Sequence, residues 1–178
     1  FRMLTFPDPK KIFEFISSLH FVSSLIRQGP SPLACLSLTK EQTKTEEMDG
    51  IFVSLLPVKF KRQALAKSLQ SGPSLVVLEC LKLIKAVLER FDLLKSEGSR
   101  QLQWSDQYID QLSAAFALWL PDLQIILTVR TRFDAFSQSK DCALINDCLH
   151  RVLESFAIVL PSSVREVKFD WMKLIPGK

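Results

Sequence analysis

The stretch Ser74–Leu94, SLVVLECLKLIKAVLERFDLL, predicts the clearest helix of the chain and decides its fold class. Apolar residues recur in it at steps of three and four, which is the spacing of one helical face. They are Val77, Leu81, Ile84, Leu88 and Phe91, with Cys80, Val87 and Leu94 widening the face. The charged residues expected on the other side are Glu79, Lys82, Lys85, Glu89 and Arg90. A helix this apolar needs helical neighbours.

The other apolar segments also show helical spacing, and glycine, proline or polar residues separate them. Gly72–Pro73 breaks the chain before Ser74, and Gly98 stands near the expected end of the helix that follows. Further helices are expected at Asp8–Gln28, Phe60–Gln70, Ser105–Trp119, Asp122–Phe133 and Cys142–Leu160, with a short apolar segment at Ile51–Leu56.

Several of these helices carry start and stop signals. Asp8–Pro9 is expected to cap and open the first helix, and Gly29–Pro30 to end it. Ser105–Asp106 and Asp122 are expected to cap the helices that follow them, because short polar side chains accept hydrogen bonds from free N–H groups there. Pro161 is expected to end the last long helix.

Two polar stretches are expected to be loops. Residues 31–50 become polar and charged after their first third, which is typical of a surface loop or mobile insertion. Ser96–Gln103 is the second expected loop. Near the end of the chain, FDWMKLI (Phe169–Ile175) is apolar again, with Asp170 as its expected cap.

These segments together predict an all-α fold. Their number and similar lengths favour an α-solenoid of HEAT/armadillo-like stacked helical hairpins over a closed bundle, with residues 1–178 as a single helical-repeat segment. No sequence repeat assigns a named repeat class. Because the chain begins at Phe1 and not at a methionine, it is expected to be a fragment of a larger chain.

Composition is that of a globular protein. The 178 residues are 47% hydrophobic and 24% charged, which suits one domain with a sizeable core. The net charge of +4 permits an acidic partner such as RNA without requiring one. No apolar run approaches the ~18–20 residues that span a bilayer, so no membrane partner is expected. The four cysteines, Cys35, Cys80, Cys142 and Cys148, lack CxxC spacing and are interpreted as reduced residues of an intracellular protein.

The sequence shows no motif of catalysis or metal binding. Phosphate-binding loops, nucleophile elbows and HExxH helices are all missing from it. Cys142, Cys148 and His150 lie close in sequence, but core cysteines and a surface histidine are the favoured interpretation. No metal, cofactor or small-molecule substrate is therefore expected. An enzyme with a helical core stays an alternative, and an inward-facing His20 or Glu14 would favour it.

One basic cluster suggests a binding partner. Lys59, Lys61, Arg62 and Lys67 fall within nine residues around the start of a short helix. Lysine, arginine and free helix N–H groups there can bind RNA phosphates without reading sequence. The alternative is an ordinary solvated helix face. Only Phe60 lies nearby to stack on a base, so recognition of single strands by stacking is not supported.

Three motifs, in order, resemble one known family. IFVSLLPVKFKRQALAKSLQSGPSLVVLECLKLIKAVLERFDLL from Ile51, LPDLQIIL (Leu120–Leu127) and FDWMKLI (Phe169–Ile175) are similar to the N-terminal domain of the nucleolar pre-ribosomal-associated protein family. The resemblance implies a nucleolar, non-enzymatic scaffold in early assembly of the large (60S) ribosomal subunit. It also implies binding to pre-ribosomal RNA and to other assembly factors, including a helicase-containing group.

A second function class stays open. A generic α-solenoid adaptor that binds proteins or peptides, and no RNA, would have the same helical pattern. In such a protein the basic cluster would be incidental, and binding would survive moderate salt.

Overall fold

The structure is a computed structural model, and it describes residues 7, 10–35, 50–52, 55, 62–134 and 140–169. Its elements are α1 (Ile12–Gln28), the 3₁₀ helix η1 (Leu33–Cys35), α3 (Arg62–Ser71), α4 (Ser74–Leu102), α5 (Asp106–Ala117), α6 (Leu123–Asp134), α7 (Lys140–Val159) and α8 (Pro161–Glu166). The predicted all-α class is confirmed, since these ranges contain no strand. No helix within them is long and apolar enough to cross a membrane.

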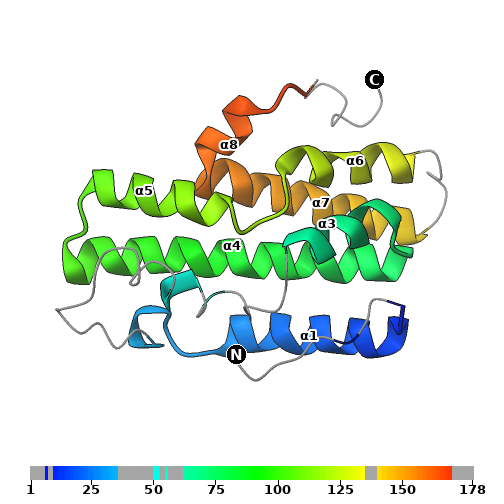
Figure 1. Cartoon of the computed structure of the whole chain (residues 1–178), viewed down its shortest axis with the longest axis horizontal. Coiled ribbons are helices and arrows are strands. Elements are labelled where there is room, and N and C mark those ends of the chain that lie inside the picture. Colours follow the sequence, from blue (N-terminus) through cyan, green and yellow to red (C-terminus); the bar gives the residue numbers. More distant parts are fainter. Residues whose placement is uncertain are drawn as a thin grey trace.

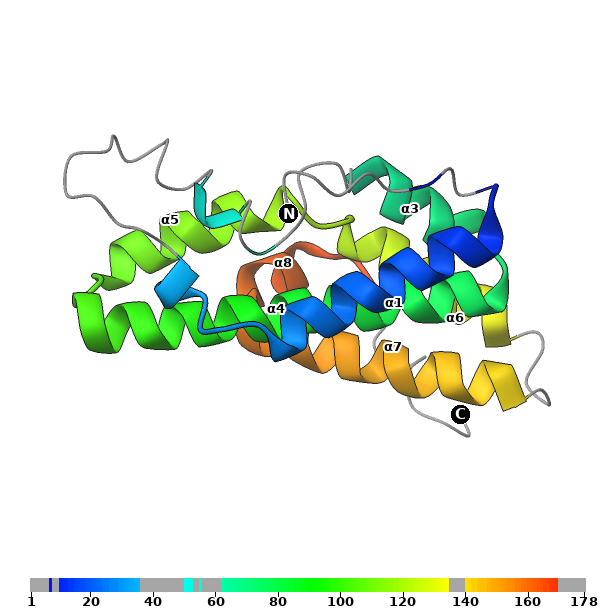
Figure 2. The same ribbon diagram turned by 90° about the horizontal axis from the view of Figure 1, so that it is seen from below.

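α4 lies at the centre of the molecule. Its most extensive contacts are with α7 and α1, which are not its neighbours in sequence (Figures 1 and 2). α3 packs on both α4 and α6, α6 packs on α7, and α8 packs on α7. Followed along the chain in Figure 1, α1, α4 and α7 run in one direction, whereas α5 and α6 run in the other.

The predicted face of α4 is buried as expected. Val77, Leu81, Ile84, Leu88 and Phe91 are all at most 1% exposed. Almost half of the 29 residues of α4 are buried, however, and the buried set extends well beyond that face. Burying a leucine or phenylalanine side chain contributes about 1.5–3 kcal/mol. The core of the protein is therefore built around this one helix.

Glu79 was predicted on the outer side of α4, and this prediction is wrong. Its side chain is 7% exposed, because α1 covers this part of α4. The Nζ atom of Lys82 lies 2.7 Å from Oε1 of Glu79, and Nδ1 of His20 on α1 lies 3.6 Å from Oε2. A buried carboxylate needs such partners, since its desolvation is costly.

Most local start and stop signals are correct. α1 ends at Gln28, before Gly29–Pro30. The Ser105 hydroxyl accepts a hydrogen bond from Tyr108 N at 3.3 Å, and Asp122 Oδ1 accepts one from Gln124 N at 2.8 Å. α5 ends at Ala117, two residues before the predicted end at Trp119.

The first helix starts later than predicted. α1 begins at Ile12 with Lys11 at the N-cap position and no side-chain cap, so the expected start at Asp8–Pro9 is wrong. Asp8 and Pro9 themselves lie outside the described residues. Pro161 follows α7 as predicted, and it is also the first residue of the short helix α8, where its missing N–H costs nothing.

Several predictions fall largely outside the described residues. They concern 36–49 of the polar stretch 31–50, and the FDWMKLI segment beyond Phe169. Of the short segment Ile51–Leu56, the described Ile51, Phe52 and Leu55 are buried and helical. The Phe52 ring lies 5.9 Å from the ring of Phe116 and 5.5 Å from that of Trp119, so this segment packs against α5.

The predicted loop Ser96–Gln103 is wrong, because α4 continues to Leu102. Gly98 is a buried residue inside the helix, and the Trp104 ring lies directly over it. The chain turns back through Gln103, whose φ is 53°, and Trp104 N donates to the Gly98 carbonyl at 3.3 Å. Gly98 therefore allows the Trp104 ring to pack closely against α4, and it does not end the helix as the sequence suggested.

We expect Gly98→Ala to destabilise the protein by about 1–3 kcal/mol, as measured by urea unfolding. A Cβ atom there would lie 2.6 Å from Cδ2 of Trp104, so the ring must move. This cost outweighs the ~0.5–1 kcal/mol that alanine gains over glycine within a helix.

Gly50→Ala is the matched control for this substitution. A Cβ on Gly50 meets nothing within 4 Å, so the free energy of unfolding should change by no more than about 0.5 kcal/mol. Equal effects of the two substitutions would contradict the role assigned to Gly98.

Candidate functional site

The predicted basic cluster lies at and before the start of α3. Arg62 is the first residue of α3 and Lys67 lies in its middle, and both side chains are exposed. Lys59 and Lys61 lie outside the described residues. Nη1 of Arg62 donates a hydrogen bond to the Leu118 carbonyl at 3.3 Å, which ties this cation to the chain after α5.

The structure does not bring Arg62 and Lys67 together. Five residues along a helix correspond to a rotation of about 140°, so the two side chains leave α3 in different directions. Arg62 lines a cavity of about 380 Å³ beside α6 and α8. Lys67 lines a groove of about 580 Å³ beside the start of α1. Each cation therefore belongs to a different surface.

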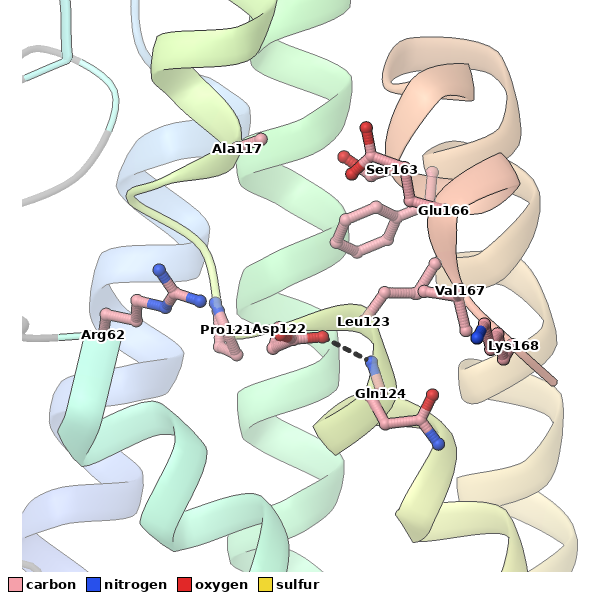
Figure 3. Close-up of a pocket in the computed structure, with 11 residues that line it drawn as sticks. Arg62, Ala117, Pro121, Asp122, Leu123, Gln124, Ser163, Glu166, Val167 and Lys168 are labelled. Carbon is pink, nitrogen blue, oxygen red and sulfur yellow. Dashed lines mark hydrogen bonds between the residues drawn. The ribbon is translucent and has the colours of Figure 1, made fainter.

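The cavity at Arg62 carries both signs of charge. Figure 3 shows Arg62 on one side and Ser163, Glu166 and Val167 on the other, with Asp122 and Leu123 between them. Lys168 adds a second cation, and Asp122 and Glu166 are two carboxylates. Because these charges offset one another, the cavity suits a polar partner of mixed charge better than a bare phosphate. The described lining residues include no histidine or cysteine.

Three of the four cysteines are core residues, as predicted, whereas the side chain of Cys35 lies outside the described part of the structure. Cys80, Cys142 and Cys148 are buried free thiols. His150 was predicted at the surface, and this is wrong: it is half-buried, with Nε2 buried and without a hydrogen bond. This histidine lies on α7, which packs against α4, α6 and α8. In the described part of the chain, no three His, Cys, Asp or Glu residues are placed to hold a metal ion.

The two residues named for the enzyme alternative face outward. The side chain of His20 is 71% exposed and that of Glu14 is 60% exposed. Glu14 pairs with Lys11 at 3.4 Å on the surface of α1. Neither residue lines the cavity at Arg62 or the groove at Lys67.

Four cations have a structural role that the sequence did not reveal. Each donates a hydrogen bond to a carbonyl at or just after the end of a helix, from a residue 56 to 64 positions away. Arg90 bonds to Gly29 and Pro30 after α1, Arg132 to Leu69 and Gly72 around the end of α3, Lys95 to Val159 of α7, and Arg62 to Leu118 after α5. Cations are favourable there because the last carbonyls lack partners and carry partial negative charge.

We expect Arg132→Ala to destabilise the protein by about 1–3 kcal/mol, because it removes two charge-assisted hydrogen bonds. Arg132 donates from Nη1 to Leu69 O at 3.2 Å and from Nη2 to Gly72 O at 2.5 Å, both partly buried. Arg132→Lys should recover only part of the loss, since lysine lacks the planar fork. Urea unfolding of each variant gives the comparison.

Arg151→Ala is the matched control for Arg132→Ala. Arg151 pairs with Asp147 at 2.9 Å on an exposed turn of α7, so its loss should change stability by less than about 1 kcal/mol. A cost for Arg151→Ala as large as that for Arg132→Ala would refute the capping role.

Cys80 is the thiol most strongly affected by its surroundings. Burial raises its pKa from 9.0 to about 12; a hydrogen bond with the Ser68 side chain lowers the pKa in part, and the charge of Glu79 raises it. Burial also raises the pKa of Cys148, against the charges of nearby cations such as Lys82. A thiol that stays protonated is a poor nucleophile, so Cys80 is a core residue and no reactive site.

The raised pKa of Cys80 predicts a loss of stability at alkaline pH. In the unfolded chain this thiol ionises near pH 9.0, but in the folded protein only near 12. Its contribution to stability is complete below pH 9 and declines as the pH rises towards 12, by on the order of 1 kcal/mol per pH unit. Urea unfolding between pH 7 and 10 should therefore show a steeper decline for the natural chain than for Cys80→Ala. Parallel pH profiles would contradict this expectation.

Comparison with known proteins gives no relative from which to transfer a function. No protein-family model matches the chain, and no curated protein or solved structure is significantly similar to it.

Proposed function

We propose that the protein is a non-enzymatic scaffold of early large-subunit ribosome assembly that acts in the nucleolus. In this proposal it belongs to the nucleolar pre-ribosomal-associated protein family, and it binds pre-ribosomal RNA and other assembly factors, including a helicase-containing group. The observation that carries the proposal is the ordered set of three motifs between Ile51 and Ile175.

The local structure of the longest motif is compatible with this proposal. Its LAKSLQSGPSLVVLECLKLIKAVLERF portion forms the end of α3, a break at Gly72–Pro73 and most of α4. Leu120–Leu127 covers the entry into α6 and its first turn. The resemblance is thus carried by whole elements, a helix, a break and a long central helix, at the centre of the fold.

We also propose that these helices are a segment of an α-solenoid. α1, α4 and α7 pack side by side and run in one direction, while α3 packs on α6 beside them. Such a pattern is what stacked helical hairpins produce, with one helix of each hairpin in each of two layers. A solenoid presents a long rigid surface, which suits a scaffold that holds a folded RNA and several proteins at once.

Lys59, Lys61, Arg62 and Lys67 are the proposed contacts to RNA phosphates. Arg62 and Lys67 are both exposed, and both lie on the short helix α3. Three other cations, Arg90, Lys95 and Arg132, are occupied by helix ends of the protein itself. Charge available to a partner is therefore smaller than the basic composition suggests. Arg62 also donates to the Leu118 carbonyl, so Lys67 is the described member of the cluster whose charge is most available to a phosphate.

We expect the combined reversal Lys59→Glu, Lys61→Glu and Lys67→Glu to weaken binding to precursor ribosomal RNA and to flatten its salt dependence. Arg62 is left in place because it caps the chain after α5. Binding is measured by fluorescence anisotropy across a salt series. The matched control reverses Lys140, Arg151 and Arg165, which are exposed on α7 and α8. Unchanged RNA affinity in the first variant would exclude the cluster.

A second candidate is a protein-binding adaptor that does not bind RNA. It is favoured by the outer side of α1, where the Phe13 side chain is 86% exposed and that of Phe21 is 53% exposed. Exposed aromatic side chains of this kind are common where another protein docks.

Crosslinking of the protein to RNA in cells, followed by sequencing of the attached RNA, separates the two candidates. Reads concentrated in precursor large-subunit ribosomal RNA would support the assembly scaffold. Recovery of RNA at background level would reject it in favour of the adaptor.

A further inference from the structure

The outer side of α1 carries large and small side chains in alternation. Phe13 is 86% exposed and Phe21 is 53% exposed. Ser17 between them is exposed, and Ser24 after them is half-buried. Because successive residues of a helix are rotated by ~100°, these four side chains leave α1 within about 80° of one another. We call this row the α1 seam.

No described helix covers the α1 seam. The buried residues of α1, such as Phe15, Leu19 and Val22, lie on the opposite side of the helix, which packs on α4. In Figures 1 and 2, α1 lies at the edge of the molecule, and no described helix lies over its outer side. Two phenylalanines exposed on one helix face are typical of a surface that contacts another protein.

The ionisable residues beside the α1 seam already have partners within the chain. Between Phe13 and Ser24 they are Glu14 and His20. Glu14 pairs with Lys11 at 3.4 Å, and Nδ1 of His20 lies 3.6 Å from Oε2 of Glu79. The seam itself carries no charged side chain. A partner that covers it would therefore bury no unpaired charge.

The alternation of the α1 seam is self-complementary when two copies of α1 lie antiparallel. With a two-fold axis that crosses α1 between residues 18 and 19, Phe13 of each copy lies opposite Ser24 of the other. Phe21 of each copy then lies opposite Ser17 of the other. Large side chains that face small ones interdigitate without voids. A parallel two-fold pair would instead place each phenylalanine against itself and each serine against itself.

We propose that the protein forms a symmetric dimer through the α1 seam, with the two α1 helices antiparallel. The phenylalanines provide the affinity, because the contact removes their exposed carbon from water. The serines opposite them set the orientation and the register of the two helices.

The area of this contact predicts a weak and reversible dimer. A covered phenylalanine buries about 150–250 Å². At their exposed fractions, Phe13 and Phe21 therefore offer about 300 Å² of apolar surface per copy. The serines and flanking side chains of the 17-residue helix raise the total to on the order of 1,000 Å² over both copies, which is the size of weak specific complexes. We expect a dissociation constant in the micromolar range.

This inference goes beyond the proposed role in ribosome assembly and does not depend on it. The α1 seam lies on a different helix from the proposed phosphate contacts at α3. The inference also assigns Phe13 and Phe21 to a second copy of the chain, and not to the foreign partner of the adaptor candidate.

Sedimentation equilibrium of the 178-residue chain over a concentration series measures the dissociation constant. Phe13→Ser/Phe21→Ser should raise this constant at least about tenfold. The matched control is Leu144→Ser/Ile158→Ser, which removes two side chains that are 57% and 70% exposed on α7. This control should dimerise like the natural chain.

Two further variants test the orientation of the helices. Ser17→Phe places two phenylalanines opposite each other in the antiparallel pair, so it should weaken the dimer at least about tenfold although it adds apolar surface. Ser17→Phe/Phe21→Ser restores one large and one small residue at each such contact, so it should dimerise nearly like the natural chain. Thermal melting of each variant within a few degrees of the natural chain shows that the fold is intact.

Three results would overturn the proposal. The first is a natural chain that stays monomeric up to about 1 mM, since the seam would then have no second copy as its occupant. The second is unchanged dimerisation of Phe13→Ser/Phe21→Ser, which would place the interface elsewhere. The third is tighter association of Ser17→Phe, which would indicate a parallel pair or unspecific apolar contact.

Discussion

Burial of α4 on several sides is the constraint on which the rest of the fold depends. A helix with one apolar face can lie on the surface of a core, whereas a helix that is apolar over most of its circumference must lie inside one. α1, α7 and α3 all pack on α4, and the ring of Phe116 from α5 stacks on that of Phe91 at 3.9 Å. Each flanking helix then needs only one apolar face of its own, which matches the sequence.

Helix ends impose a second constraint on this arrangement. Helices packed around one centre bring their C-terminal carbonyls near neighbouring helices, where water cannot always reach them. Arg90, Arg132, Lys95 and Arg62 satisfy these carbonyls from other elements. These four basic residues link neighbouring helices through hydrogen bonds to carbonyl groups. The net charge of +4 therefore overstates the positive surface offered to an acidic partner.

The sequence predicts what depends on local spacing. The apolar face of α4, the caps at Ser105 and Asp122 and the stop after Gln28 are all decided within a few residues. The predictions that proved wrong depend on contacts between residues that are far apart in the chain. The sequence indicates a helix stop at Gly98, but in the structure Trp104 packs over this residue. The sequence likewise indicates a surface position for Glu79, but in the structure α1 covers it.

The candidate site was predictable only in part. Composition and spacing identified Arg62 and Lys67 as cations near one helix start, and the rotation between positions five apart on a helix already separates them. The surfaces that they line also include residues of α1, α6 and α8, which are distant in sequence. The groove that Lys67 lines carries no sequence signal, because Ile12, Ala64 and Val76 come from three different helices. A resemblance between motifs suggests a partner class, and it does not locate a surface.

α5 has a consequence for how the protein opens. Of its side chains only Leu112 and Phe116 are buried, and the Phe116 ring stacks on the Phe91 ring of α4. Regions with few buried contacts separate from the rest at a lower free energy than global unfolding requires. We therefore expect α5 to open before the rest of the fold, so that its amide hydrogens exchange with solvent while those in the middle of α4 stay protected. Its release would uncover the Phe91 ring and expose an apolar strip on the central helix without melting the core.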